Sequence, residues 1–170
     1  MEDFVTQYFL KTGAGWTVIG AMFAVMFGGV GSARGIRIAG GQAAGVLAEK
    51  PELFGKLLVL MALPGTQGFY GFIIAIFMAA QTGILTPPLT VTPLMGVSLL
   101  AVGICAGIVL YRSAVYQGEA SAASISLTAR RPEESGRSIL IPALVETYAV
   151  VALLASILFI MWVTAMKVGG

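Results

Sequence analysis

The sequence contains 170 residues, of which 58% are hydrophobic and only 11% are charged, and its mean hydropathy is +0.92. Soluble domains carry about 25% charged residues, so this composition predicts an integral membrane protein. The small net charge of +2, without a run of basic residues, argues against a nucleic-acid partner. Histidine is absent and the one cysteine, Cys105, lies in an apolar run, which argues against disulfides and His/Cys metal sites.

Long uncharged stretches follow one another along the chain. The first, residues 12–33, is long enough for one membrane-spanning helix. The second, residues 57–111, is too long for one helix and is broken by the proline-rich segment 86–93, so it predicts two spans joined by a turn. A fourth span lies within residues 138–166. We therefore predict an all-α membrane protein whose four helices cover about 13–48, 53–82, 95–129 and 135–166.

The two halves of the chain are related by a shift of 81 residues without a gap. The shift places Glu49-Lys50-Pro51-Glu52 over Arg130-Arg131-Pro132-Glu133, and it pairs several further positions. Such a repeat is typical of a duplicated structural unit, here a helical hairpin. The predicted units are a first hairpin repeat at residues 1–86, a linker at 87–94 and a second hairpin repeat at 95–170.

Basic residues give the orientation of these hairpins in the membrane. Eight of the ten Lys and Arg residues lie around the two turns inside the repeats. By the positive-inside rule, both charged turns face the cytoplasm and both termini face the opposite side. The sequence thus predicts a multi-pass protein of the cell membrane.

Glu146 is the only charged side chain in residues 138–166. It follows the charged turn by about 11 residues, or about 16 Å along a helix, which places it near the middle of the bilayer. An ionised carboxylate there costs at least ~2.5 kcal/mol, so it indicates a functional site. The repeat places Gly65 at the equivalent position, so the chain carries one such site.

Further polar groups lie at a comparable predicted depth. Gln117 and Glu119 belong to the third helix. Positions on one face of the second helix are Leu63, Thr66, Gln67 and Tyr70. Oxygen-bearing groups of this kind suit a hard cation such as Na⁺. The alternative is that each polar side chain makes an ordinary hydrogen bond between helices.

Pro64 adds a backbone ligand to this prediction. Because it has no N–H, it leaves the carbonyl of Leu60 unpaired and kinks the helix. A kink there turns nearby carbonyls, including that of Leu63, toward a bound ion. The alternative is an ordinary proline kink that neighbouring helices stabilise.

Arg37 and Glu119 lie closer to the charged turns, one position apart in the repeat frame. We expect them to form an ion pair between inner helices, within one subunit or between two. The alternative is that both face water or lipid headgroups.

Two motifs resemble those of a known family. Leu63-Pro64-Gly65-Thr66-Gln67-Gly68-Phe69-Tyr70-Gly71 is similar to the second-helix motif of the proteolipid ring subunit of prokaryotic V-type ATPases. Val145-Glu146-Thr147-Tyr148-Ala149 resembles the fourth-helix motif of that family, and the likeness covers nearly the whole chain. The resemblance implies a closed rotor ring of identical subunits, with the first and third helices on the inner wall.

The resemblance also implies a ligand set. In sodium-transporting members a glutamate, a threonine, two glutamines and a leucine carbonyl hold the ion, and a tyrosine supports the glutamate. These roles fall on Glu146, Thr66, Gln67, Gln117, the backbone oxygen of Leu63, and Tyr70. Glu119 and Arg37 depart from the residue types expected of the family.

The implied partners are a stator membrane subunit that carries an arginine, a cytoplasmic central-stalk subunit at loops 49–52 and 130–134, and lipid. A phosphate-binding loop ending in Gly-Lys-Ser/Thr is absent, so we expect ATP chemistry in other subunits and no enzyme activity in this chain.

Two alternatives remain open at this point. A rotor subunit that carries only H⁺ requires just the carboxyl group of Glu146, whereas Thr66 and Gln117 favour Na⁺. A small stand-alone transporter or channel built from two repeats is the other alternative, although such proteins usually contain inverted repeats or discontinuous helices.

Overall fold

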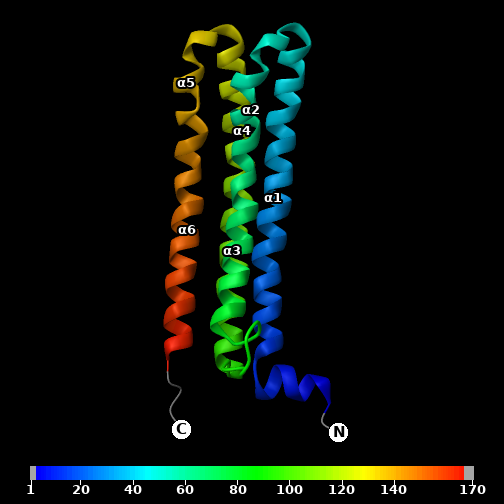
Figure 1. Ribbon diagram of the computed structural model, residues 1–170, viewed down its shortest axis with the longest axis vertical. Helices are drawn as coiled ribbons and strands as arrows, with labels where there is room; N and C mark the ends of the chain where they lie inside the picture. The colour runs from blue at the N-terminus through cyan, green and yellow to red at the C-terminus, as the bar shows by residue number, and fades with distance from the viewer. Residues whose placement is uncertain (1–2, 167–170) are drawn as a thin grey trace.

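The computed structural model describes residues 3–166, which form a long bundle of helices (Figure 1). The described residues contain helices and connecting segments but no β-strand. Four segments are long and apolar enough to cross a membrane: Ala14–Glu49, Pro51–Gln81, Pro93–Arg130 and Pro132–Ala165. The predicted all-α fold with four membrane spans in two hairpins is confirmed. The first two and last four residues of the predicted repeats lie outside the described residues.

The first hairpin consists of one continuous helix and one interrupted helix. Its elements are α1 (Ala14–Glu49), the short turn η2 (Pro51–Leu53), α2 (Phe54–Ala62), the 3₁₀ turn η3 (Leu63–Gly65) and α3 (Thr66–Gln81). The interruption coincides with Pro64, which has no N–H to donate and whose ring disfavours a regular α-helix at this point. The kink predicted at Pro64 is therefore present as a 3₁₀ turn.

The second hairpin repeats this plan. Its elements are α4 (Pro93–Arg130), η4 (Pro132–Glu134), α5 (Ser135–Ser138) and α6 (Leu140–Ala165). The break between α5 and α6 has a clear cause, because Pro142 cannot donate a hydrogen bond to the carbonyl of Ser138. The Ser124 hydroxyl on α4 donates to that carbonyl instead, at 2.8 Å. A neighbouring helix thus satisfies the group that the proline leaves unpaired.

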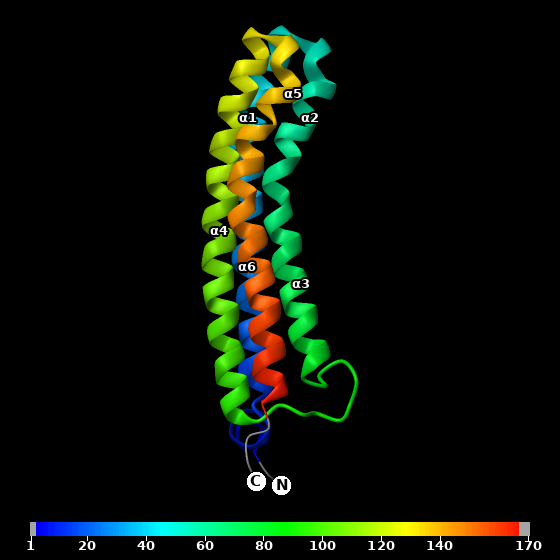
Figure 2. The ribbon, with the colours of Figure 1, turned by 90° about the vertical axis from the view of Figure 1, so that its left-hand side faces the viewer.

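The two hairpins run in the same direction. Both hairpin turns lie at one end of the bundle, and η1 (Thr6–Lys11) and the end of α6 lie at the other end (Figures 1 and 2). Two lysines join the turns: Lys50 Nζ donates to the carbonyl of Ala129 at 2.6 Å, and Lys56 Nζ donates to that of Pro132 at 3.0 Å. The repeats are therefore parallel, and their charged turns form one surface.

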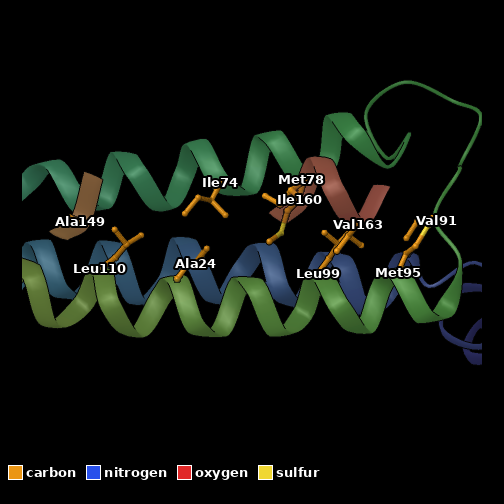
Figure 3. Close-up of a cluster of buried hydrophobic side chains, with 12 residues drawn as sticks. Ala24, Ile74, Met78, Val91, Met95, Leu99, Leu110, Ala149, Ile160 and Val163 are labelled. Atoms are coloured by element: carbon orange, nitrogen blue, oxygen red, sulfur yellow. The ribbon is translucent and has the colours of Figure 1, made fainter. Parts of the chain in front are cut away.

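Helices α1 and α4 pack side by side, while α3 packs on α1 and α6 packs on α4. Buried side chains from all four helices fill the part of the bundle that lies away from the turns (Figure 3). A second, smaller cluster lies near the turns and consists of Ala39, Ala43, Leu53, Leu57, Leu60 and Ile125. The polar residues discussed below lie between these two apolar clusters.

Glycine allows α1 and α4 to approach each other closely. A Cβ atom added at Gly31 would lie 2.6 Å from the Cα atom of Tyr111, which is shorter than any real contact. Small residues at helix contacts have this effect in membrane proteins, where packing rather than water exclusion drives association.

We predict that Gly31→Ala destabilises the protein by about 1–3 kcal/mol, because the added methyl group meets backbone that cannot move aside. Gly41→Ala on the same helix is the matched control, since a Cβ there meets no atom within 4 Å. The measurement is the melting temperature in detergent. Equal melting temperatures for the two variants would contradict the close approach.

Candidate functional site

Glu146 lies one turn after Pro142 on α6 and is only partly buried. Both of its oxygens accept hydrogen bonds from other helices. The Tyr70 hydroxyl on α3 donates to Oε1 at 2.6 Å, and Gln117 Nε2 on α4 donates to Oε2 at 3.3 Å. Hydrogen bonds to an ionised carboxylate are stronger than those between neutral groups. The carboxylate therefore connects α6 to both hairpins at one point.

Gln67 and Gln117 extend this network into the interior. Both side chains are fully buried. Gln67 Nε2 donates to Gln117 Oε1 at 2.6 Å, and Gln117 Nε2 also donates to the carbonyl of Pro142 at 3.1 Å. Because an unpaired amide is costly in an apolar interior, these bonds hold the two amides in one arrangement across the contact between the hairpins.

The 3₁₀ turn positions the remaining predicted groups. Thr66 is the first residue of α3, directly after the turn. Its hydroxyl donates to the carbonyl of Leu63 at 3.1 Å and lies 3.4 Å from Gln67 Oε1. The turn thus places a hydroxyl, a backbone carbonyl and an amide oxygen beside each other.

All six residues predicted for the site belong to this one network, which joins α3, α4 and α6. Sequence reasoning gave no role to Ser113, which takes part in this network, or to Ser32 on α1, which bonds to the residue after Gln67. Ser113 accepts a hydrogen bond from Gln67 Nε2 and donates to the carbonyl of Val145, both at 3.4 Å. Ser32 accepts from the backbone N–H of Gly68 at 2.9 Å. The signal that identifies them is the repeat, because the shift of 81 residues pairs Ser32 with Ser113.

Arg37 and Glu119 do not belong to this network, and both side chains are exposed. Within residues 3–166 an ion pair joins Arg137 to Glu134 at 3.4 Å, but none joins Arg37 to Glu119. We expected this ion pair either within one subunit or between two, and the first of these predictions is therefore wrong.

A comparison with known protein families identifies the chain. The model of the family described as the C subunit of ATP synthase matches it twice, at residues 19–78 and 100–159. The chain belongs to this family. The starts of the two matches lie 81 residues apart, the same shift that relates the two halves of the sequence. Members of the family form the ring of rotary ATPases, and other subunits carry out catalysis.

Two relatives carry more specific names. The V-type sodium ATPase subunit K of Enterococcus hirae is 33% identical over 161 residues, which cover 95% of this chain and 98% of that protein. The A-type ATP synthase subunit K of Methanocaldococcus jannaschii is 39% identical over 145 residues, or 85% of this chain and 61% of that protein. The resemblance to the ring subunit of V-type ATPases is confirmed.

The hydrogen bonds of Ser113 lead to a prediction. We expect Ser113→Ala to destabilise the protein by about 1 kcal/mol, because its hydroxyl joins α4 to both α3 and α6. Ser98→Ala is the matched control on the same helix, since the Ser98 hydroxyl bonds only to the carbonyl of Leu94. Melting temperatures in detergent measure both effects. A larger loss for the control would contradict the role of Ser113 between the helices.

Proposed function

We propose that this chain is the rotor-ring subunit of a V-type ATPase and that it carries Na⁺ across the membrane on Glu146. The observation that carries this proposal is the position of the carboxylate. It lies in a membrane-spanning helix, and two helices from different hairpins each donate a hydrogen bond to it. A membrane helix that keeps an ionisable group at this position does so for function.

The surrounding groups support Na⁺ as the ion. Alongside Glu146, the candidate ligands are the hydroxyl of Thr66, the carbonyl of Leu63 and the amide oxygens of Gln67 and Gln117. All are oxygen donors, which hard cations prefer. Tyr70 orients the carboxylate through its hydrogen bond and has no need to contact the ion. The name of the Enterococcus hirae relative, a sodium ATPase subunit, agrees with this choice.

Neutralisation of charge explains how such a site drives rotation. An ionised Glu146 facing lipid costs at least ~2.5 kcal/mol, whereas Glu146 with a bound cation is nearly neutral. Subunits with a bound ion therefore turn through the bilayer, and subunits without one are held back. An empty carboxylate is stable beside a fixed positive charge, which we assign to an arginine of the stator subunit. Moving one charge across a membrane potential of 100 mV involves ~2.3 kcal/mol of work.

The charged turns give the proposed orientation. Both lie at the same end of the bundle, where Lys50 and Lys56 join them. Basic residues concentrate on the cytoplasmic side of membrane proteins, so we place this end in the cytoplasm and both termini on the opposite side. The joined turns at 49–52 and 130–134 then form the surface that contacts the central stalk.

A ring subunit that carries only H⁺ is the second candidate, because a carboxyl group alone suffices for proton transfer. The hydrogen-bonded set of Thr66, Gln67 and Gln117 favours Na⁺ over this alternative. A stand-alone transporter is less consistent with the structure, since its two hairpins run in parallel and not in inverted orientation (Figure 1).

Labelling of Glu146 with a carbodiimide tests the ion. We expect the labelling rate to fall as Na⁺ is added at fixed pH, because the bound ion excludes the proton that the reagent requires. The same concentrations of K⁺ serve as the matched control, and Glu146→Gln gives the background. If Na⁺ protected no better than K⁺, the sodium assignment would be wrong and the proton-only form would stand.

Removal of the Tyr70 hydroxyl tests how the carboxylate is held. A hydrogen bond to a charged group contributes about 1.5–3 kcal/mol. We therefore expect Tyr70→Phe to raise the Na⁺ concentration for half-protection by about tenfold to a hundredfold. Tyr8→Phe, in η1 at the far end of the bundle, should leave this concentration unchanged. An unchanged value for Tyr70→Phe would exclude Tyr70 from the support of the site.

A further inference from the structure

One buried hydroxyl group of the bundle has no hydrogen-bond partner. Ser121 on α4 is 0% exposed. In the part of the chain that the structure describes, its hydroxyl is the one buried side-chain polar group that is left unpaired. Buried hydroxyls are nearly always paired with protein or with ordered water, and an unpaired polar group is costly inside a membrane. The hydroxyl of Ser121 therefore requires a partner.

The helix that carries Ser121 does not provide this partner. The hydroxyls of Ser98, Ser126 and Ser156 each donate to the carbonyl four residues earlier in their own helix. Serine in a helix commonly makes this bond, but Ser121 does not make it with the carbonyl of Gln117. Its hydroxyl is thus directed toward the neighbouring helices and not back onto α4.

Ser121 faces the interrupted helix of the first hairpin. One turn before it on α4, Gln117 bonds to Gln67, which follows the 3₁₀ turn η3. One turn after it, Ile125 packs in the same cluster as Leu60, which precedes that turn. Residues four apart on a helix share a face. Ser121 therefore lies between these two levels, opposite η3.

Each proline break leaves a carbonyl without its helical donor, and α4 has a serine near each one. The carbonyl of Ser138 receives the hydroxyl of Ser124 at 2.8 Å. Pro64 leaves the carbonyl of Leu60 in the same condition, because proline has no N–H, and Leu60 is itself fully buried. Ser121 lies about one turn before Ser124 on α4. The unpaired hydroxyl and the free carbonyl are thus the complementary groups of the first break.

We propose that an ordered water molecule binds between Ser121 and the carbonyl of Leu60. This water accepts a hydrogen bond from the hydroxyl and donates one to the carbonyl, so it satisfies both buried groups at once. The first break is then held to α4 through a water, whereas the second break is held directly by Ser124.

The water also makes Ser121 a positioning residue for the ion. The turn η3 begins three residues after Leu60, and it places the carbonyl of Leu63 beside the hydroxyl of Thr66. A bridge from α4 to Leu60 fixes where these two candidate ligands lie relative to Gln117. Ser121 thus acts on the ion only through the water and the turn. This step rests on the proposed function, whereas the water itself does not.

A density map of the assembled ring, at a resolution that shows waters, tests the water directly. We expect density within hydrogen-bond distance of both Ser121 Oγ and the Leu60 carbonyl oxygen. Ser121→Asn is the matched replacement, because its amide brings an N–H donor to about the place of the water. That variant should lose the density and bond to the carbonyl directly. A Ser121 hydroxyl bonded to the carbonyl of Gln117, with no water beside it, would overturn the proposal.

Protection of Glu146 by Na⁺ tests the positioning role. We expect Ser121→Ala to raise the Na⁺ concentration for half-protection by about threefold to tenfold, the effect of one lost hydrogen bond. Ser121→Asn should reverse most of this rise. Ser156→Ala is the matched control, since Ser156 is also buried but bonds only to the carbonyl of Ala152. Equal values for Ser121→Ala and the control would overturn the positioning role.

Melting temperatures in detergent separate the two levels of the proposal. Ser121→Ala should melt below Ser156→Ala, and Ser121→Asn should recover most of the loss, whichever ion the ring carries. A wild-type ring that Na⁺ does not protect would contradict the proposed function, but these melting temperatures and the density would still establish the water. Equal melting temperatures for the two alanine variants would count against the water itself.

Discussion

The structure depends on one carboxylate held at the contact between two hairpins. Glu146 accepts one hydrogen bond from α3 and one from α4, although its own helix is α6. Neither hairpin alone can provide this arrangement, because Tyr70 belongs to the first and Gln117 to the second. An ionised carboxylate in a membrane-spanning helix is costly, so the two hydrogen bonds that Glu146 accepts become a constraint on how the helices pack. Residues that join the hairpins, such as Gln67 and Gln117, are thus also the proposed ion ligands.

Duplication explains why the subunit has one site rather than two. A shift of 81 residues converts Glu146 into Gly65, Gln117 into Ile36 and Gln67 into Tyr148, so the equivalent positions hold no carboxylate and no amide. One subunit therefore has a single hydrogen-bonded carboxylate between its hairpins.

Much of the fold and of the candidate site could be predicted from the sequence, because the signals lie within short segments of the chain. Uncharged stretches identified the membrane spans, and the isolated Glu146 identified the centre of the network. Ser113 was missed, because a serine in a helix rich in glycine and alanine usually serves close packing. The bond from Ser124 to the carbonyl of Ser138 was also missed, since it depends on the register of α4 against α6. Contacts between helices follow from packing, which no single helix specifies.

The network also constrains how the subunit moves. If the hairpins separated during rotation, Glu146 would lose its hydrogen bond from Tyr70, and the buried amide of Gln67 would lose its bond to Gln117. Each unpaired polar group costs several kcal/mol in a medium without water. The glycine contacts between α1 and α4 oppose such separation, since the two backbones touch. We therefore expect the four helices to turn as one rigid unit, so that the ion proposed at Glu146 is exchanged by changes of side chains rather than by opening of the bundle.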